Sequence, residues 1–298
     1  MQNFFRGLQQ VMEQPLISIV IPCYNGSALI GETLGSILSQ DLHNFEIIVV
    51  DDGSSDGLKE KLQTFSDERI KYIHQDNQGV SAARNTGLSA SMGEYVIFFD
   101  ADDKMTPGFL EIRMNTLKQN NIIQFICGEV LKFTGNAIDN TYFRGTSPDA
   151  IREILFYDKD VTTCPSNYMF RKEFLLKNNL RFNRNLSSTA DKLFLIECSL
   201  KGKSDIVKEK GKLLYRVSGQ SMSHHFTEKL VRDNEEYYTQ LQKKNLVPEE
   251  LKKQSMFLGN FMLSGSYSKL GKYGKAMSYA AKAFALRPAG FIQKILHK

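Results

Sequence analysis

The sequence predicts an α/β protein whose mainly parallel sheet is covered by helices on both faces. Between residues 16 and 105, four segments of strand length alternate with segments of helical periodicity. Most of these strand segments are almost continuously apolar, as strands buried on both faces of a parallel sheet are. Three of the four end in polar motifs, and the carboxyl ends of parallel strands are where such folds bind their ligands.

The first strand is predicted at 16–22, in the apolar run LISIVIP, and ends before the turn-forming pair Asn25-Gly26. A helix over 27–40 follows, because leucine and isoleucine recur there on one face. The run FEIIVV at 45–50 predicts the second strand. This strand leads directly into the polar motif DDGSSDG.

The third strand is short and is predicted within 67–75. A helix rich in small residues is expected over 79–93, where Gly93 ends it. The fourth strand, EYVIFF at 94–99, runs into the acidic motif DADD. The polar motifs after the first, second and fourth strands are therefore expected at one edge of the sheet.

Beyond Met105 the pattern is weaker, and loops take a larger share of the chain. From about Thr227 onward every segment has helical periodicity. The elements predicted between these two points are a helix at 107–120, a strand at 122–133, a helix at 191–202 and a strand at 212–218.

The composition excludes several classes of protein. The four cysteines lie far apart with no Cys-x-x-Cys pair, which argues against a zinc site or a disulfide framework and fits a reducing compartment. No segment reaches the roughly 18 apolar residues that a membrane span needs. We therefore expect a cytoplasmic protein.

The net charge of +5 is unevenly distributed. Residues 251–298 contain nine Lys or Arg and no Asp or Glu, so the first 250 residues carry 5 − 9 = −4. A basic tail indicates an anionic partner, either the inner face of a membrane, with peripheral contact, or a protein. A solvated helical face explains the same charges equally well, and no nucleic-acid partner is expected.

Asp100, Asp102 and Asp103 crowd together at the end of the fourth strand. Carboxylates this close raise one another's pKa and repel, so a cation is expected among them. Mn²⁺ and Mg²⁺ prefer such oxygen ligands and complete their shells with water and phosphate oxygens. The structural alternative is that these acids cap a following helix, and Asp103 is the candidate for that role.

Two other kinds of site are excluded by the spacing of the motifs. If Asp52 is position one of a calcium-binding loop, position twelve is Gln63 instead of Glu, and a strand precedes the loop instead of a helix. The turn after the first strand, CYNGSA, lacks the glycine pattern of a dinucleotide site. A hard cation bound together with an anionic ligand remains.

Three long motifs follow one another in order: SIVIPCYNGSALIGETLGSILSQ, FEIIVVDDGSSDG and NQGVSAARNTGLSASMGEYVIFFDADD. Together they resemble the family 2 nucleotide-sugar glycosyltransferases over about residues 16–110, with a fainter match to about residue 225. The resemblance implies a GT-A fold and transfer of a sugar from a nucleoside diphosphate to a hydroxyl group, with inversion at the anomeric carbon. We expect a UDP-sugar donor and a glycan or lipid-linked saccharide as acceptor.

The same resemblance assigns roles to individual residues. Mn²⁺ or Mg²⁺ is expected on Asp102 and Asp100, with His224 from a later loop as a further ligand. The residues expected to contact the nucleotide-sugar are Pro22, Tyr24, Asn25, Asp52, Arg84, Asn85, Asp100 and Ala101.

The resemblance also points to Asp191 as the general base, at the start of a predicted helix and before an apolar run. The acceptor hydroxyl must lose a proton as it attacks, whereas a nucleotide leaving group needs charge neutralisation and no second carboxyl as general acid. In the family an acidic residue usually precedes this base, but here the preceding residue is Ala190. A carboxylate that only stabilises the helix N-terminus is the structural alternative for Asp191.

We expect a GT-A catalytic domain over 1–226, with a nucleotide-sugar half at about 16–105 and an acceptor half at about 106–226, followed by a basic helical extension over 227–298. The stretch 267–288 has the spacing of one tetratricopeptide-like hairpin, which packs on the body or on a partner. The sequence leaves open whether this extension forms a homodimer.

Two alternative functions remain open. A degenerate transferase fold that binds nucleotide or sugar without turnover is consistent with Ala190. A sugar nucleotidyltransferase shares the nucleotide, the metal and the sheet, but the loop PCYNGSAL carries no basic residue to hold a triphosphate.

Overall fold

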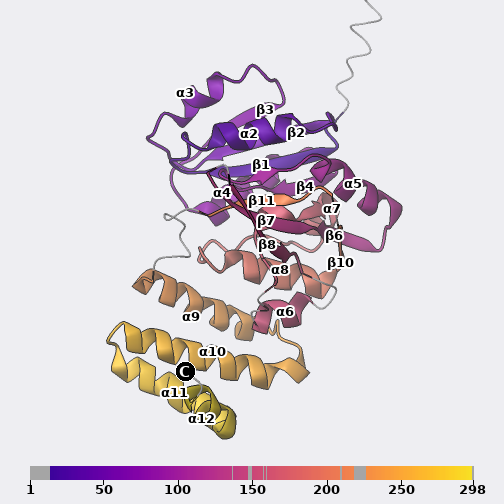
Figure 1. The fold of residues 1–298 in the computed structure, drawn as a ribbon. Coiled ribbons are helices and arrows are strands. Elements are labelled where there is room, and N and C mark those ends of the chain that lie inside the picture. The colour runs from indigo at the N-terminus through magenta and orange to yellow at the C-terminus, as the bar shows by residue number, and fades with distance from the viewer. Residues whose placement is uncertain are drawn as a thin grey trace, which may run out of the picture.

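The computed structural model describes residues 14–135, 137–146, 150–156, 158, 160–208, 210–217 and 226–296, and Figure 1 shows its fold. Its main sheet has seven strands. Neighbouring strands are parallel except at β9, which is antiparallel to both β4 and β6. The predicted mainly parallel sheet is thus confirmed. The strand order is β10 (Lys203–Ile206), β6 (Ile123–Cys127), β9 (Met169–Arg171), β4 (Tyr95–Phe98), β1 (Ile17–Cys23), β2 (Phe45–Asp51) and β3 (Ile70–His74).

Strand β1 shows why helices cover both faces of this sheet. All seven of its residues are buried, and successive side chains point to opposite faces. Ile19 joins the apolar cluster that includes residues of α2 (Ile30–Leu38) and α5 (Phe109–Gln119). Val20 joins the cluster on the other face, with residues of α4 (Val80–Ala90) and α8 (Ala190–Lys201).

Helix α4 packs closely on β1 through a glycine. A Cβ atom on Gly87 would lie 2.2 Å from Cγ1 of Val20, so a larger side chain cannot be accommodated without movement. Arg84 lies one turn earlier on the same helix, and its guanidinium group is carried to the carboxyl edge of the sheet. The short α3 (Leu58–Gln63) follows the loop after β2 and lies at the end of the molecule opposite the C-terminus (Figure 1).

The predicted helix over 27–40 is shorter in the structure, where α2 begins at Ile30. Ser27 does not cap it. Its backbone N–H donates to Oδ2 of Asp56 at 2.8 Å, and its hydroxyl donates to the Asp56 carbonyl at 3.0 Å. Ser27 therefore joins the loop after β1 to the loop after β2.

A second sheet has four strands in the order β5 (Lys104–Met105), β11 (Leu213–Arg216), β7 (Glu129–Thr134) and β8 (Ala137–Arg144). The single strand predicted at 122–133 is wrong, because β6 and β7 belong to different sheets. The chain bends between them at Gly128, where a Cβ atom would lie 2.5 Å from Nη2 of the buried Arg113. A glycine is what permits the turn from one sheet to the other.

Of the remaining body elements, two lie between β8 and β9, and the third follows β9. They are α6 (Ala150–Phe156), the 3₁₀ helix η1 (Pro165–Asn167) and α7 (Lys172–Lys177). The predicted helix over 191–202 corresponds to α8, and the strand predicted at 212–218 corresponds to β11.

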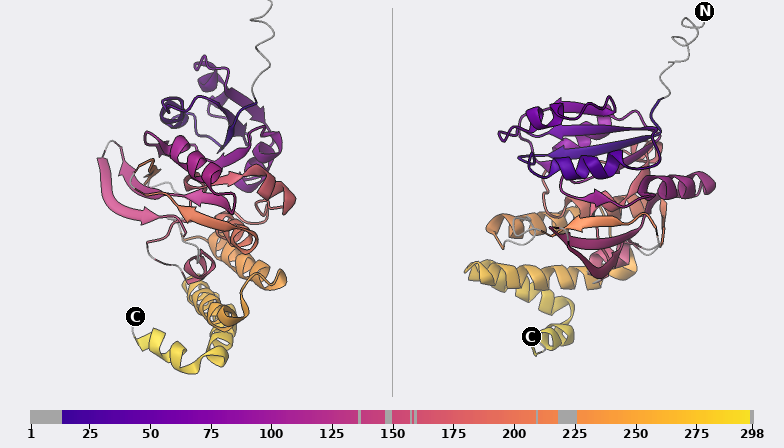
Figure 2. Two further views of the ribbon diagram at one scale, coloured as in Figure 1. Left: turned by 90° about the vertical axis from the view of Figure 1, so that its right-hand side faces the viewer. Right: turned by 45° about the horizontal axis from the view of Figure 1, so that its top comes forward.

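The C-terminal extension is helical, as predicted, and lies at the opposite end of the molecule from α3 (Figure 2). Several of its buried residues, among them Tyr237 and Leu263, belong to the same apolar cluster as Phe194 of α8. The extension therefore packs on the body. Its elements are α9 (Glu228–Lys243), α10 (Glu249–Lys269), α11 (Tyr273–Leu286) and α12 (Pro288–Leu296).

Helices α10 and α11 form the hairpin that the spacing predicted. The turn between them contains Gly271 at φ 71°, a left-handed conformation that favours glycine. Ala276 and Ala283 are buried in α11. Among the described residues, we find no helix that combines the length and the apolarity needed to cross a membrane.

Candidate active site

The loops after β1 and β2 form one platform at the carboxyl edge of the sheet. The backbone N–H of Asn25 donates to Oγ of Ser54, and its side-chain oxygen accepts from the N–H of Ser55, both at 2.9 Å. Asn25 adopts a φ of 51°, which Asn tolerates better than most residues. Tyr24 is 57% exposed on this platform, while Pro22 is buried within β1. An aromatic ring is thus available to a ligand above the sheet.

Asp52 is buried, and its carboxylate holds the segment that enters α4. Oδ1 accepts from the side-chain amide of Gln75 at 2.7 Å and from the N–H of Gln78 at 2.9 Å. Oδ2 accepts from the N–H of Gly79 at 2.8 Å. The structure therefore shows an anchoring role for Asp52, and its predicted contact with the nucleotide stays a prediction.

Arg84 joins two of the predicted site residues. Its Nη1 lies 2.6 Å from Oδ1 of Asp191, and its Nη2 lies 2.8 Å from Oδ1 of Asp100. Burial opposes the charge of Arg84, but the two carboxylates outweigh it and raise the pKa of the guanidinium group. A permanent cation therefore bridges the expected base and the expected metal-binding motif.

Asp191 lies in the first turn of α8 with its carboxylate turned toward Arg84. Burial raises the pKa of Asp191 to about 6, and the charge of Asp100 adds to this increase, whereas Arg84 acts against it. A carboxyl group with this pKa is ionised at neutral pH and still has appreciable affinity for a proton. These are the properties that a general base requires.

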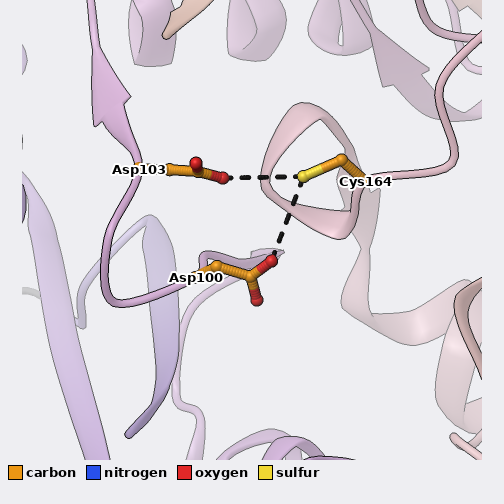
Figure 3. A group of neighbouring side chains, drawn as sticks. All are labelled: Asp100, Asp103 and Cys164. Carbon is orange, nitrogen blue, oxygen red and sulfur yellow. Dashed lines mark hydrogen bonds between the residues drawn. The ribbon is translucent and has the colours of Figure 1, made fainter. Parts of the chain in front are cut away.

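The carboxylates of Asp100 and Asp103 lie next to the thiol of Cys164 (Figure 3). The Sγ atom lies 3.5 Å from Oδ2 of Asp103 and 4.0 Å from Oδ2 of Asp100. Oδ1 of Asp103 accepts from the N–H of Arg216 in β11 at 3.0 Å. Asp103 is therefore not the helix cap that the sequence indicated, because the chain after it forms β5 and its carboxylate binds the neighbouring strand and a thiol.

Asp100 and Asp103 offer the carboxylate oxygens that a hard divalent cation prefers, whereas the thiol of Cys164 is a soft donor that such a cation does not prefer. Ligand atoms of Asp100, Asp103 and Cys164 lie within 4.8 Å of one another. Burial and then the charges of its neighbours raise the pKa of Asp103 well above its usual range. The pKa of Asp102 is raised to about 6 by burial and then by Asp100. For both residues burial is the main cause and neighbouring carboxylates add to it, so a cation among these oxygens would favour their ionised form.

The guanidinium group of Arg216 binds the backbone of the acidic motif. Its Nε donates to the Asp102 carbonyl at 2.8 Å, and its Nη2 donates to Glu32 at 2.9 Å. Arg216 therefore holds the backbone at Asp102 and pairs with Glu32 of α2.

The sequence of the chain matches that of a known protein family. A model of the family described as "Glycosyl transferase family 2" matches residues 18–177, which is more than half of the chain. The chain belongs to glycosyl transferase family 2. The resemblance stated from the sequence motifs is thereby confirmed.

Curated relatives support this membership. An uncharacterised glycosyltransferase of Rickettsia conorii is 40% identical over 116 residues, which are 39% of this chain and 19% of that protein. The family 2 chain thus spans about a fifth of that relative's length. The putative glycosyltransferase EpsH of Bacillus subtilis is 28% identical over 261 residues, covering 83% of this chain and 75% of EpsH. The glucosyltransferase WfgD of Escherichia coli is 36% identical over 128 residues, covering 43% of this chain and 50% of WfgD.

Solved structures confirm the GT-A-like fold. Residues 1–349 of Staphylococcus aureus TarS, solved in complex with UDP-GlcNAc, align with a TM-score of 0.65 at 18% identity, covering 90% of this chain and 91% of that one. The mannosyltransferase PcManGT of Pyrobaculum calidifontis, in complex with GDP-Man and Mn²⁺, aligns with a TM-score of 0.62 at 15% identity, covering 99% and 86%.

The family 2 site brings together only some of the residues that the sequence singled out. Arg84, Asp100 and Asp191 meet directly, and the Ala101 carbonyl accepts from the hydroxyl of Thr33 at 2.8 Å. Asn85 instead bonds the backbone of Phe182, and His224 lies outside the described residues. Cys164 was missed, since an isolated cysteine in TTCPSN gives no sign of its neighbours.

Proposed function

We propose that the chain is a metal-assisted, inverting transferase that moves a sugar from a UDP-sugar to a hydroxyl group of a lipid-linked saccharide. The observation that carries this proposal is the bridge from Asp191 through Arg84 to Asp100, with N–O distances of 2.6 and 2.8 Å. The bridge places the candidate base and the acidic motif in one site. An activity of this kind needs both, because one group accepts a proton while another region holds the leaving diphosphate.

In the proposed reaction, the acceptor oxygen forms a bond with the anomeric carbon on the face opposite the diphosphate. The bond between that carbon and the diphosphate oxygen breaks, and its electron pair leaves with the nucleotide. The proton of the attacking hydroxyl passes to the carboxylate of Asp191. A base with a pKa of about 6 is suited to this transfer at neutral pH.

Arg84 has two tasks in this scheme. It holds the carboxylate of Asp191 in one orientation, and its positive charge lies beside the region where the diphosphate develops negative charge. A divalent cation on Asp100 and its acidic neighbours would supply further neutralisation of the leaving group. The exposed ring of Tyr24 is available to stack on the nucleotide base.

The relatives support the substrate classes. The name of WfgD describes transfer of glucose from UDP-Glc to GlcNAc-diphosphoundecaprenol, and TarS was solved with UDP-GlcNAc. In this chain, an open groove of about 880 Å³ runs between the start of α4, residues 184–187 and α9. The groove borders the segment that precedes Asp191, and we assign the acceptor to it.

The test combines binding with turnover. Calorimetric titration of UDP, GDP and CDP with Mn²⁺ identifies the nucleotide, and release of UDP from UDP-Glc or UDP-GlcNAc in the presence of a synthetic GlcNAc-diphosphate lipid measures transfer. We expect Asp191→Asn to bind UDP normally and to keep only a small, measurable residual rate of transfer. A folded protein that binds no nucleotide with Mn²⁺ would contradict the proposal, and release of pyrophosphate from UTP and a sugar phosphate would identify a nucleotidyltransferase instead.

A further inference from the structure

A buried carboxylate of the C-terminal extension binds the segment that leads to Asp191. Oδ1 of Asp233, in α9, accepts from the N–H of Ser187 at 2.6 Å and from its hydroxyl at 3.2 Å. Oδ2 accepts from the hydroxyl of Ser188 at 2.7 Å, and from the N–H and hydroxyl of Thr189 at 2.9 and 2.7 Å. Asp233 is only 6% exposed. Three consecutive residues are therefore held by one side chain.

This arrangement holds the N-cap residue of α8 in place. Thr189 is the N-cap residue, but its side chain accepts no hydrogen bond from the helix. Its hydroxyl donates to Asp233 instead. A negative carboxylate at the start of α8 also interacts favourably with the helix dipole. The backbone N–H that Asp233 binds in Thr189 is that of the N-cap residue itself, whereas a local cap accepts from the second or third residue of the helix. The extension thus fixes the start of α8 from another helix.

Helix α4 holds the same segment from the other side. The hydroxyl of Ser81 donates to the Leu186 carbonyl at 3.0 Å, and Arg84 binds Asp191 itself. The segment from Leu186 to Asp191 therefore lies between two helices, each of which contributes a buried polar side chain. Ala190, inside it, contributes no polar side chain of its own.

We propose that Asp233 is a positioning residue for catalysis: it fixes residues 187–189 and thereby the first turn of α8, which carries Asp191. The inference rests on the proposed role of Asp191 as general base. A base must lie within hydrogen-bonding reach of the acceptor hydroxyl, and a displacement of about 1 Å costs about 100-fold in rate. Asp233 borders the groove assigned to the acceptor, but both of its carboxylate oxygens accept hydrogen bonds from residues 187–189, so its role in this scheme is to hold that segment.

Asp233→Asn tests the inference in the full chain. The amide keeps one acceptor oxygen but turns an NH₂ group toward donors, so residues 187–189 lose part of their anchoring. We expect kcat to fall about 10- to 100-fold while the affinity for UDP with Mn²⁺ is unchanged. Glu228→Gln is the matched control, because it makes the same carboxyl-to-amide change on α9 in a surface pair with Lys272 and Arg232. We expect the control to keep wild-type kcat.

The double variant Asp191→Asn, Asp233→Asn separates positioning from a general loss of structure. If Asp233 acts through Asp191, the double variant is no slower than Asp191→Asn alone. A further slowing by the same factor that Asp233→Asn shows by itself would overturn the inference, as would a wild-type kcat in Asp233→Asn. If the Asp233→Asn protein does not fold, Thr189→Val is tested in its place. Valine removes the hydroxyl donor to Asp233 and keeps the backbone N–H donor.

The two proposals can fail separately. Asp233→Asn at wild-type rate, with Asp191→Asn still strongly slowed, would reject the positioning role and leave the proposed function in place. Asp191→Asn at wild-type rate would reject the base and the positioning role together. Amide hydrogen exchange over residues 186–192 adds a direct readout: we expect faster exchange in Asp233→Asn, and unchanged exchange would contradict the anchoring.

Discussion

The side chain of Asn85 forms two hydrogen bonds with the backbone of Phe182, 97 residues further along the chain. Its Nδ2 donates to the Phe182 carbonyl at 2.8 Å, and its Oδ1 accepts from the Phe182 N–H at 2.9 Å. Both residues are buried. Helix α4 thus holds the segment around Phe182 through Asn85 and the candidate base through the adjacent Arg84.

Asn85→Ala is expected to lower the free energy of unfolding by about 1–3 kcal/mol, because two buried backbone groups lose their partners. Thermal unfolding measures the loss. The affinity for UDP is expected to stay near that of the wild type. Unchanged stability with a dissociation constant raised about tenfold would instead support the sequence-based assignment of Asn85 to the donor.

Gly87→Ala and Gly35→Ala form a matched pair, since both glycines lie inside helices. A Cβ on Gly87 would lie 2.2 Å from Val20, so the substitution is expected to destabilise the fold by about 1–3 kcal/mol. No atom lies within 4 Å of a Cβ on Gly35, so alanine there is expected to stabilise it by about 0.5–1 kcal/mol. Thermal unfolding of both variants checks the opposite signs, and a stabilising Gly87→Ala would contradict the close packing of α4 on β1.

Arg84→Lys is expected to lower kcat about 100-fold, because one ammonium group cannot hold Asp191 and Asp100 in the fixed geometry of a guanidinium fork. Initial rates with saturating donor measure the effect. Arg69→Lys is the control, since Arg69 pairs with Asp67 at 2.7 Å in a partly exposed position outside the site. Equal rates for Arg84→Lys and the wild type would show that the bridge is not needed for transfer.

The rate of transfer is expected to rise with pH and to reach half its maximum near pH 6. Burial raises the pKa of Asp191 to about 6, so below this pH the base already carries the proton that it must accept. Asp102 also has a pKa raised to about 6, by burial and then by Asp100, so kcat/KM should fall more steeply in acid than kcat. Initial rates from about pH 5 to about pH 8 test this. A kcat independent of pH over that range would exclude Asp191 as the base.

Removal of metal with EDTA is expected to abolish binding of UDP, and Mn²⁺ is expected to restore it. Asp100→Asn should weaken Mn²⁺-dependent binding about 10- to 100-fold, because it removes charge from the centre of the acidic cluster. Calorimetry measures both effects, with Asp67→Asn at the surface as control. UDP binding that is equally strong in EDTA would show that the cluster does not hold a metal for the donor.

The strands at the centre of the main sheet could be predicted because each is a run of apolar residues that are neighbours in the sequence. The runs that become β1, β2 and β4 are almost continuously apolar, and their observed bounds differ from the predicted ones by at most one residue at either end. The polar motifs after them meet at one edge because the strands run parallel. The later strands could not be placed in this way, since β9 is antiparallel and only three residues long.

The sequence by itself determined the family, the sheet and the acidic edge, because hydrophobic runs and contiguous motifs are properties of neighbouring residues. Only the tertiary structure decided which side chains share the site. Cys164 joins Asp103, and Asp233 reaches residues 187–189, through contacts between segments far apart in the chain. Such contacts depend on how the helices pack on the sheet, and no local periodicity records that packing.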